Sequence, residues 1–335
     1  MQATATLALK PGDVLEGGYV LRERIGHGGM GDVFLADWLA TGRTVAIKAL
    51  RPQLADWPAR TGQMRHEAEA ARRVHSPHCV AVIEDRVPSH GMPYLVMEHV
   101  PGRSLGQLIT DESLPLARVI ELFDQVLAAI GAAHASGVIH GDVKSDNLLV
   151  EHTAGTDRVT LIDFGLARID GAPTRVDVED GEVMVSGTPE YMAPEVIRGA
   201  PPVRASDLYS AGVILYELLT GTTPFRGGSA LQIMVRHAHD AVLPPSLRAP
   251  DRDIPRAVDR VVLRALDKHP EARFPDAETF ARELRAAAVA SRPVADRSAL
   301  PDQRWTQELP TLIHAAPLPR ERIARGSERC GAGHP

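Results

Sequence analysis

The sequence contains the stretch His140-Gly141-Asp142-Val143-Lys144-Ser145-Asp146-Asn147, in which two carboxylates, one ammonium group and one amide lie within eight residues. Asp163-Phe164-Gly165 begins sixteen residues after Asn147, and Ala193-Pro194-Glu195 follows further along the chain. Each of these motifs is a modest signal by itself. Their order along one chain is specific, so this part of the sequence decides which fold and which chemistry we expect.

Upstream of this stretch, a glycine-rich segment runs from Gly26 to Gly31 and continues into Asp32 and Val33. Its pattern, Gly-x-Gly-x-x-Gly-x-Val, lets backbone N–H groups approach phosphate oxygens closely. A plain hairpin turn is an alternative interpretation, and a dinucleotide-binding fold is another. The dinucleotide fold requires a helix that begins at the third glycine. A strand pattern follows the glycines instead, which argues against that fold.

Lys48 ends the apolar run Val45-Ala46-Ile47, seventeen positions after Gly31. An ammonium group that points inward from a small sheet needs a carboxylate or a phosphate to offset its desolvation. Glu67, nineteen residues later, is the expected partner, and Glu69 is the less favoured alternative. These charges are solvated at the surface in many proteins, but the ordered set of motifs argues against that interpretation here.

Hydrophobic periodicity divides the chain into two parts. Residues 19–50 alternate like strands between turn signals, which predicts an antiparallel three-stranded meander. A helix from about Trp57 to Val74 and strands over 80–86 and 93–98 complete a small sheet that carries one helix. After residue 102 the pattern becomes helical, with predicted helices over 116–136, 204–220, 229–239, 254–267 and 277–290.

With these motifs in this order, the chain resembles the eukaryotic-like (Hanks-type) Ser/Thr protein kinases of bacteria over about residues 19–289. The resemblance implies an α+β, bilobal protein-kinase-like fold. The small antiparallel-sheet lobe with one main helix would span residues 19–97, a hinge 98–102, and a mostly helical lobe 103–289. Residues 1–18 would form an N-terminal lead, and residues 290–335 a flexible tail rich in Pro and Arg.

The resemblance also implies the roles of the reacting groups. Asp142 would accept the proton of the substrate hydroxyl, and Lys144 would contact the γ-phosphate of ATP. Lys48 would bind the α- and β-phosphates, held in place by Glu67. Asn147 and Asp163 would hold Mg²⁺, with Mn²⁺ as an alternative metal.

Further positions match the nucleotide site and the scaffold of the family. Gly26, Gly28 and Gly31 of the glycine loop would cover the phosphates. Met97 at the gatekeeper position and the hinge residues Glu98 to Val100 would meet adenine. The adenine ring would be sandwiched by Val33, Ala46 and Leu149. Asp207 would brace the backbone of the catalytic loop, and Arg273 would form a buried ion pair with Glu195.

One position departs from the family pattern. The usual His-Arg-Asp reads His140-Gly141-Asp142, so the arginine that normally receives an activation-loop phosphate is absent. Residues 175–185 are acidic and contain no Ser, Thr or Tyr, so a phosphate would have neither an acceptor hydroxyl nor this arginine. We hypothesise activity that does not depend on phosphorylation there, with neutral drift at Gly141 as the alternative. A required phosphate on Thr174 or Ser186 would contradict the hypothesis.

The leading functional prediction is a Ser/Thr protein kinase that uses ATP and Mg²⁺ in cytoplasmic signalling. Lys144 and the segment Gly187 to Tyr191 favour Ser or Thr over Tyr as the acceptor. A pseudokinase that serves as a nucleotide-binding scaffold is the alternative, although it predicts loss of residues that this chain retains. A small-molecule phosphotransferase is less favoured, because it would not need the segment Gly187 to Glu195.

Composition limits the classes of protein to consider. The chain has 335 residues, 44% hydrophobic and 24% charged residues and a net charge of -6, without the basic excess typical of nucleic-acid or anionic-membrane binding. Cys79 and Cys330 do not suggest a disulfide framework, and no stretch approaches about 18 uncharged apolar residues. We expect a cytoplasmic protein that binds ATP and a protein substrate, with no nucleic-acid partner and no direct membrane span.

Two further features lie outside the ordered set of motifs. His75, His78 and Cys79 have the spacing of metal ligands, but they follow the predicted helix where packing is expected instead. The tail at 290–335 carries seven Lys or Arg against five Asp or Glu, a net charge of +2, and Thr306 and Thr311 there are candidate autophosphorylation or docking sites. A regulatory partner would act through this tail.

Overall fold

The computed structural model describes residues 9–27, 31–51, 58–88, 92–170, 178–179, 182–183 and 187–290. Internal contacts divide the chain into two units, Met1–Arg292 and Pro293–Pro335, and all described residues belong to the first. Several sequence-based expectations therefore lie outside the described residues. They concern Gly28, Trp57, Thr174, Ser186, Thr306, Thr311 and Cys330.

The N-terminal part is a six-stranded sheet in the order β1-β2-β3-β4-β6-β5. Strands β2, β3 and β4 pair antiparallel in sequence order, as the predicted meander requires. One side of this sheet buries Tyr19, Phe34 and Ile47 in a separate apolar cluster. The strands are β1 (Val14–Leu15), β2 (Tyr19–His27), β3 (Gly31–Trp38), β4 (Arg43–Leu50), β5 (Val82–Arg86) and β6 (Tyr94–Glu98).

Among the described residues of this part, helix α2 (Pro58–Arg73) is the one long helix, and it packs against β5 and β6. Its sequence is rich in alanine, and Ala68 and Ala71 are buried, so small side chains allow the helix to approach the sheet. Glu67 lies on the same side and is only 2% exposed. A buried carboxylate requires a partner, and the sheet supplies one, as described below.

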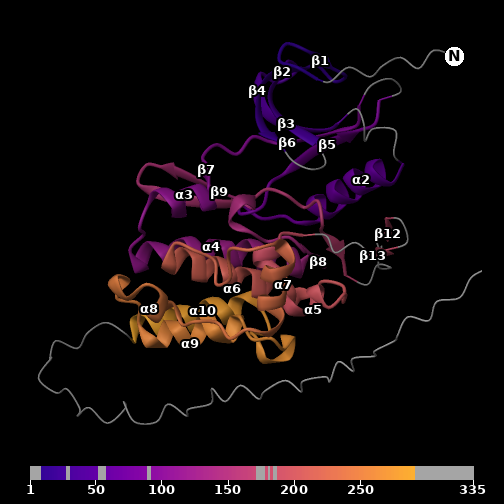
Figure 1. The fold of residues 1–335 in the computed structure, drawn as a ribbon. Helices are drawn as coiled ribbons and strands as arrows, with labels where there is room; N and C mark the ends of the chain where they lie inside the picture. The colour runs from indigo at the N-terminus through magenta and orange to yellow at the C-terminus, as the bar shows by residue number, and fades with distance from the viewer. Residues whose placement is uncertain are drawn as a thin grey trace, which may run out of the picture. The chain divides into compact units, whose positions relative to one another are not determined.

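The C-terminal part is built around α6 (Arg204–Thr220), in which thirteen of seventeen residues are buried. Helices α4 (Leu116–Ala135) and α9 (Arg256–Ala265) pack against it, and α10 (Ala277–Val289) packs against both of them. Figure 1 shows these helices below the sheet of the N-terminal part. The shorter helices are α3 (Leu105–Asp111), α5 (Pro194–Ile197), α7 (Ala230–His239) and α8 (Pro245–Arg248).

A β-hairpin joins the two parts of the functional region. Its strands β9 (Leu148–Thr153) and β10 (Thr156–Leu161) pair along their whole length, and Ile162 N donates to Asn147 O at 3.0 Å. The hairpin therefore returns the chain so that Asn147 and Asp163 lie close together. The sequence patterns above predict neither this hairpin nor α3.

Several short elements complete the fold. Strand β7 (Arg103–Ser104) pairs with β9, β8 (Val138–Ile139) pairs with β11 (Arg168–Ile169), and β12 (Val178–Glu179) pairs with β13 (Glu182–Val183). The 3₁₀ turns are η1 (Ser145–Asn147), η2 (Pro189–Tyr191), η3 (Pro250–Arg252) and η4 (Pro270–Ala272). Among the described residues, no helix has the length and apolar character needed to cross a membrane.

Candidate active site

The backbone of the catalytic loop is held by a buried carboxylate from α6. Asp207 accepts hydrogen bonds from His140 N and Gly141 N, both at 2.8 Å, and its Oδ2 lies 2.8 Å from His134 Nε2. Burial raises the pKa of Asp207, but His134, His140 and the amide of Gly141 together outweigh it, and the net pKa lies below the usual value. Sequence reasoning identified Asp207 as this brace but missed His134, whose only sequence signal is a histidine on the apolar face of α4.

Gly141 occupies a backbone conformation that explains its residue type. Its φ is +79°, in the left-handed region that glycine adopts without steric cost. A Cβ at this position would lie 2.9 Å from the carbonyl oxygen of Leu166. Glycine therefore allows the segment after Asp163-Phe164-Gly165 to approach the catalytic loop closely.

Asp142 lies at the centre of a polar cluster formed with Lys144 and Thr188. Asp142 Oδ1 accepts from Thr188 N at 3.1 Å and from Thr188 Oγ1 at 3.0 Å. Lys144 Nζ lies 2.8 Å from Asp142 Oδ2 and 2.8 Å from Thr188 Oγ1. The sequence marked residue 188 only as part of the segment Gly187 to Tyr191, so its contact with Asp142 is new information from the structure.

Lys48 links the sheet to helix α2 and to the hairpin end. Its Nζ lies 2.7 Å from Glu67 Oε1 and 3.1 Å from Asp163 Oδ1. Glu69 instead pairs with Arg73 on its own helix. The expected choice of Glu67 over Glu69 thus matches the geometry, and the same ammonium group also serves a second carboxylate.

Lys48, Glu67 and Asp163 form a set of one cation and two carboxylates, and their pKa values reflect that imbalance. Burial raises the pKa of Glu67 to about 7, with Lys48 opposing and Asp163 adding to the effect. For Asp163, burial acts in the same upward direction, but Lys48 and the amide of Gly165 outweigh it and hold the pKa at about 2. Lys48 itself stays cationic, because the two carboxylates overcome its desolvation and raise its pKa.

The oxygen atoms near the hairpin end suit a hard divalent cation. Asn147 donates through its amide nitrogen to Asp142 O at 3.0 Å, which leaves the amide oxygen for another role. The Asp163 side chain is about 40% exposed although its Oδ1 is engaged by Lys48. Carboxylate and amide oxygens are the ligands that Mg²⁺ and Mn²⁺ accept, so the residues present fit such an ion.

The residues assigned to adenine lie on the neighbouring strands. Ala46 and Met97 are opposite each other in the β4–β6 pair, both less than a tenth exposed and in the main core, against which Val33 and Val100 pack. Glu98 follows Met97 and donates its N–H to Ala81 O. Leu149 lies on β9, opposite Thr160.

Two other expectations concern the scaffold. Arg273, with a fully buried side chain, donates to both carboxylate oxygens of Glu195 at 2.8 Å. His78 Nδ1 bonds the Val159 carbonyl at 2.9 Å, and Cys79 is buried. The first pair matches the expected ion pair, and the contacts of His78 and Cys79 match the packing interpretation. Within the described part of the chain, no cluster of three or more His, Cys, Asp or Glu residues has metal-binding geometry.

Comparisons with known proteins agree with this geometry. Residues 19–285 match the protein kinase domain family. The chain is 37% identical over 313 residues to serine/threonine-protein kinase pkn3 of Myxococcus xanthus, covering 91% of this chain and 55% of the relative. It is 36% identical over 270 residues to serine/threonine-protein kinase PknB of Mycobacterium tuberculosis (strain ATCC 25618 / H37Rv), covering 79% and 42%. The chain therefore spans about half the length of these curated relatives.

Among solved structures, the Mycobacterium tuberculosis PknI kinase domain is 26% identical to this chain, with a TM-score of 0.62. The match covers 84% of this chain and 100% of that structure. The predicted bilobal fold, with its antiparallel-sheet lobe and its helical lobe, is thus confirmed. The chain is similar to bacterial serine/threonine-protein kinases, and it belongs to the protein kinase domain family.

Proposed function

We propose that this chain is a protein Ser/Thr kinase that transfers the γ-phosphoryl group of ATP to a hydroxyl of a protein substrate. The observation that carries the proposal is the joint position of two clusters. Lys48 reaches both Glu67 and Asp163, and Asp142 is held by Lys144 and Thr188. Phosphoryl transfer depends mainly on positioning and charge neutralisation, and these clusters supply both.

In this mechanism, Lys48 binds the α- and β-phosphates, and Glu67 fixes the position of its ammonium group. Asn147 and Asp163 would hold the divalent cation, which neutralises phosphate charge when bound. The glycine loop, including Gly26, Gly28 and Gly31, covers the phosphates. The backbone of Glu98 to Val100 pairs with adenine, while Val33, Ala46, Met97 and Leu149 surround its ring.

Asp142 positions the acceptor hydroxyl and takes its proton. As the hydroxyl oxygen forms a bond to the γ-phosphorus, the bond from that phosphorus to the bridging β-phosphate oxygen breaks, leaving ADP. Lys144 stabilises negative charge on the transferring group. Its contact with Thr188 Oγ1 links the catalytic loop to the segment before η2, which supports a Ser or Thr acceptor.

The same proposal assigns the parts of the chain. Residues 19–97 form the small lobe, 98–102 the hinge and 103–289 the helical lobe, with a lead at 1–18 and a tail at 290–335. We place the protein in the cytoplasm, with the tail as the point of contact for a regulatory partner. Activity is independent of phosphorylation in residues 175–185, because these residues contain no Ser, Thr or Tyr and Gly141 stands where the family has the phosphate-binding arginine.

A radiometric transfer assay tests the proposal. The full chain is incubated with γ-labelled ATP, Mg²⁺ and a basic protein substrate, and we expect label on serine or threonine. Asp142→Asn should lower the rate by at least about 10²-fold. Glu121→Gln is the matched control, because Glu121 is an exposed carboxylate on α4, and it should retain the full rate. Nucleotide binding without transfer by the unaltered chain would instead identify a nucleotide-binding scaffold.

A further inference from the structure

A row of arginines runs along the outward side of α9. Arg256, Arg260 and Arg264 are spaced four residues apart, so they lie about 6 Å apart along one face of the helix. Arg256 and Arg260 are exposed. Within the described residues, neither Arg256 nor Arg260 has an ion-pair partner. The chain as a whole has a net charge of -6. The row is thus a local concentration of positive charge on an acidic protein.

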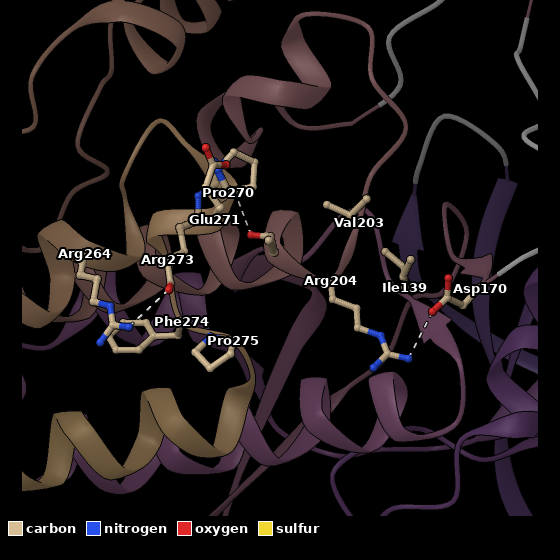
Figure 2. A pocket seen from close by; sticks show the side chains of 11 residues that line it. Ile139, Asp170, Val203, Arg204, Arg264, Pro270, Glu271, Arg273, Phe274 and Pro275 are labelled. Atoms are coloured by element: carbon tan, nitrogen blue, oxygen red, sulfur yellow. Dashed lines mark hydrogen bonds and ion pairs between the residues drawn. The ribbon is translucent and has the colours of Figure 1, made fainter.

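The row ends at a recess of about 540 Å³ that Arg264 helps to line. Figure 2 shows Phe274 and Pro275 on one side of this recess and Ile139 and Val203 on the other. These walls are apolar, and a volume of this size falls in the range that accommodates organic ligands and large side chains. The recess therefore suits an apolar group at the end of a charged track.

Four of the five charged side chains that line the recess have ion-pair partners, and the fifth, the exposed Glu271, lies 4.0 Å from His269. Arg273 in the floor is committed to Glu195, and Arg204 at the rim pairs with Asp170 at 3.2 Å. Arg264 pairs with Glu283, but both side chains are about 40% exposed, and such a surface pair is worth little. An occupant therefore gains by matching Arg256 and Arg260 with charge and the recess with an apolar side chain.

We propose that the α9 arginine row and the recess form a docking surface for an extended acidic segment of a partner protein. In an extended chain, alternate side chains lie on one face about 6.6–6.8 Å apart, close to the spacing of the arginines. Acidic residues at positions i and i+2 meet Arg256 and Arg260. A large apolar residue at i+4 then reaches Arg264 and enters the recess. The proposal does not depend on the kinase activity proposed above.

Fluorescence anisotropy with the full chain and labelled synthetic peptides tests this proposal. The probe is Gln-Glu-Gln-Glu-Gln-Phe-Gln, which has no acceptor hydroxyl. Its affinity should fall by about tenfold in Arg256→Glu/Arg260→Glu, since each reversal replaces attraction with repulsion. Arg43→Glu/Arg226→Glu makes the same change of net charge at exposed positions elsewhere, and should change the affinity by less than about twofold.

A second variant tests the apolar part of the surface. Val203 is 41% exposed and precedes α6 as its N-cap, where aspartate is a favoured residue. Val203→Asp should therefore keep the fold, which circular dichroism will check. It should nevertheless lower the affinity for the probe peptide by at least about fivefold. Replacing the phenylalanine of the probe by glutamine should have a similar effect.

Three outcomes would overturn the proposal. The first is no saturable binding of the probe, and the second is equal loss of affinity in the control and the α9 variants. The third is tighter, arginine-dependent binding of a short DNA duplex, which would make the row a nucleic-acid surface. A peptide with lysines in place of the glutamates should not bind.

Discussion

Two sets of buried charge in this molecule are built differently. Lys48 serves two carboxylates, Glu67 and Asp163, at the junction of the sheet, α2 and the hairpin, and the Asp163 side chain stays partly exposed. Arg273 and Glu195 form a one-to-one pair with two parallel hydrogen bonds inside the helical part. The first set has one more carboxylate than cations, and one of its carboxylates is partly exposed, whereas in the second set one cation matches one carboxylate. The comparison teaches that the unbalanced set, Lys48 with Glu67 and Asp163, is suited to bind a ligand. The balanced set, Arg273 with Glu195, is suited to hold the fold.

Breaking the balanced set should produce the largest loss of stability. Arg273→Met removes the counter-charge of the largely buried Glu195, to which only the hydroxyl of Ser206 then still donates among the side chains. It also removes the hydrogen bonds to the carbonyls of Ala205 and Asp267. We expect the free energy of unfolding to fall by about 3–5 kcal/mol, measured by urea denaturation. The double variant Arg273→Met/Glu195→Met should recover part of this loss, since it leaves no unpaired charge. A double variant less stable than the single one would contradict this account.

Breaking the unbalanced set should instead affect activity. Lys48→Met removes the ammonium group proposed to bind phosphate, so the rate of transfer should fall by about 10²–10³-fold. The free energy of unfolding should change much less than in Arg273→Met, because the remaining carboxylates are free to bind protons. Steady-state kinetics and urea denaturation on the same preparation check both parts. Arg73→Met, which breaks an exposed pair with Glu69, should leave the rate unchanged.

A buried histidine outside both sets predicts a dependence of stability on pH. Burial, with help from Lys268, lowers the pKa of His237 to about 4, while its Nδ1 bonds the hydroxyl of Tyr209 at 2.8 Å. The imidazole of His237 is therefore protonated near pH 6.5 in the unfolded chain, but only near pH 4 in the folded chain.

Stability contributed at this position is therefore complete above about pH 6.5 and falls as the pH drops toward 4, by up to about 3 kcal/mol. His237→Gln should reduce the slope of unfolding free energy against pH in this interval. His152→Gln, at an exposed histidine, is the control. An unchanged slope in His237→Gln would show that other groups dominate.

The smallest expected effect concerns the glycine of the catalytic loop. Gly141→Ala should cost about 1–3 kcal/mol, because alanine is strained at positive φ and its Cβ would crowd Leu166 O. Gly155→Ala is a matched control, since Gly155 has a similar φ of +80° but no atom within 4 Å of the added Cβ. The difference between the two losses measures the close contact, and equal losses would show that the contact carries no cost.

The sequence predicted those parts of the site that depend on local motifs. Lys48 and Glu67 were expected to pair because a buried ammonium group needs a carboxylate, and Asp207 was expected to hold the loop from the family resemblance. The helix over 204–220 also agrees with α6 to the residue, because its apolar character stops at a clear glycine, Gly221. Strong local patterns were therefore sufficient to predict most of the fold.

Other features depend on distant contacts that no local pattern encodes. His134 reaches Asp207 across 73 positions, and Lys144 reaches Thr188 across 44. The hairpin β9–β10 was missed because its strands mix polar and apolar residues, and its partner β7 is only two residues long. Helix α3 is short, with seven residues, and relies on the capping box formed by Ser104 and Gln107. Such elements are defined by packing and capping more than by periodicity.

The most direct test of the central distinction compares Lys48→Met with Arg273→Met in two measurements at one temperature where both proteins stay folded. We predict that Lys48→Met retains most of the free energy of unfolding but loses single-turnover phosphoryl transfer. Arg273→Met should lose several kcal/mol of stability, about 3–5, yet transfer phosphate at a rate within about tenfold of the unaltered chain while folded. The reverse pattern, with transfer retained in Lys48→Met, would contradict the assignment of the unbalanced set to function.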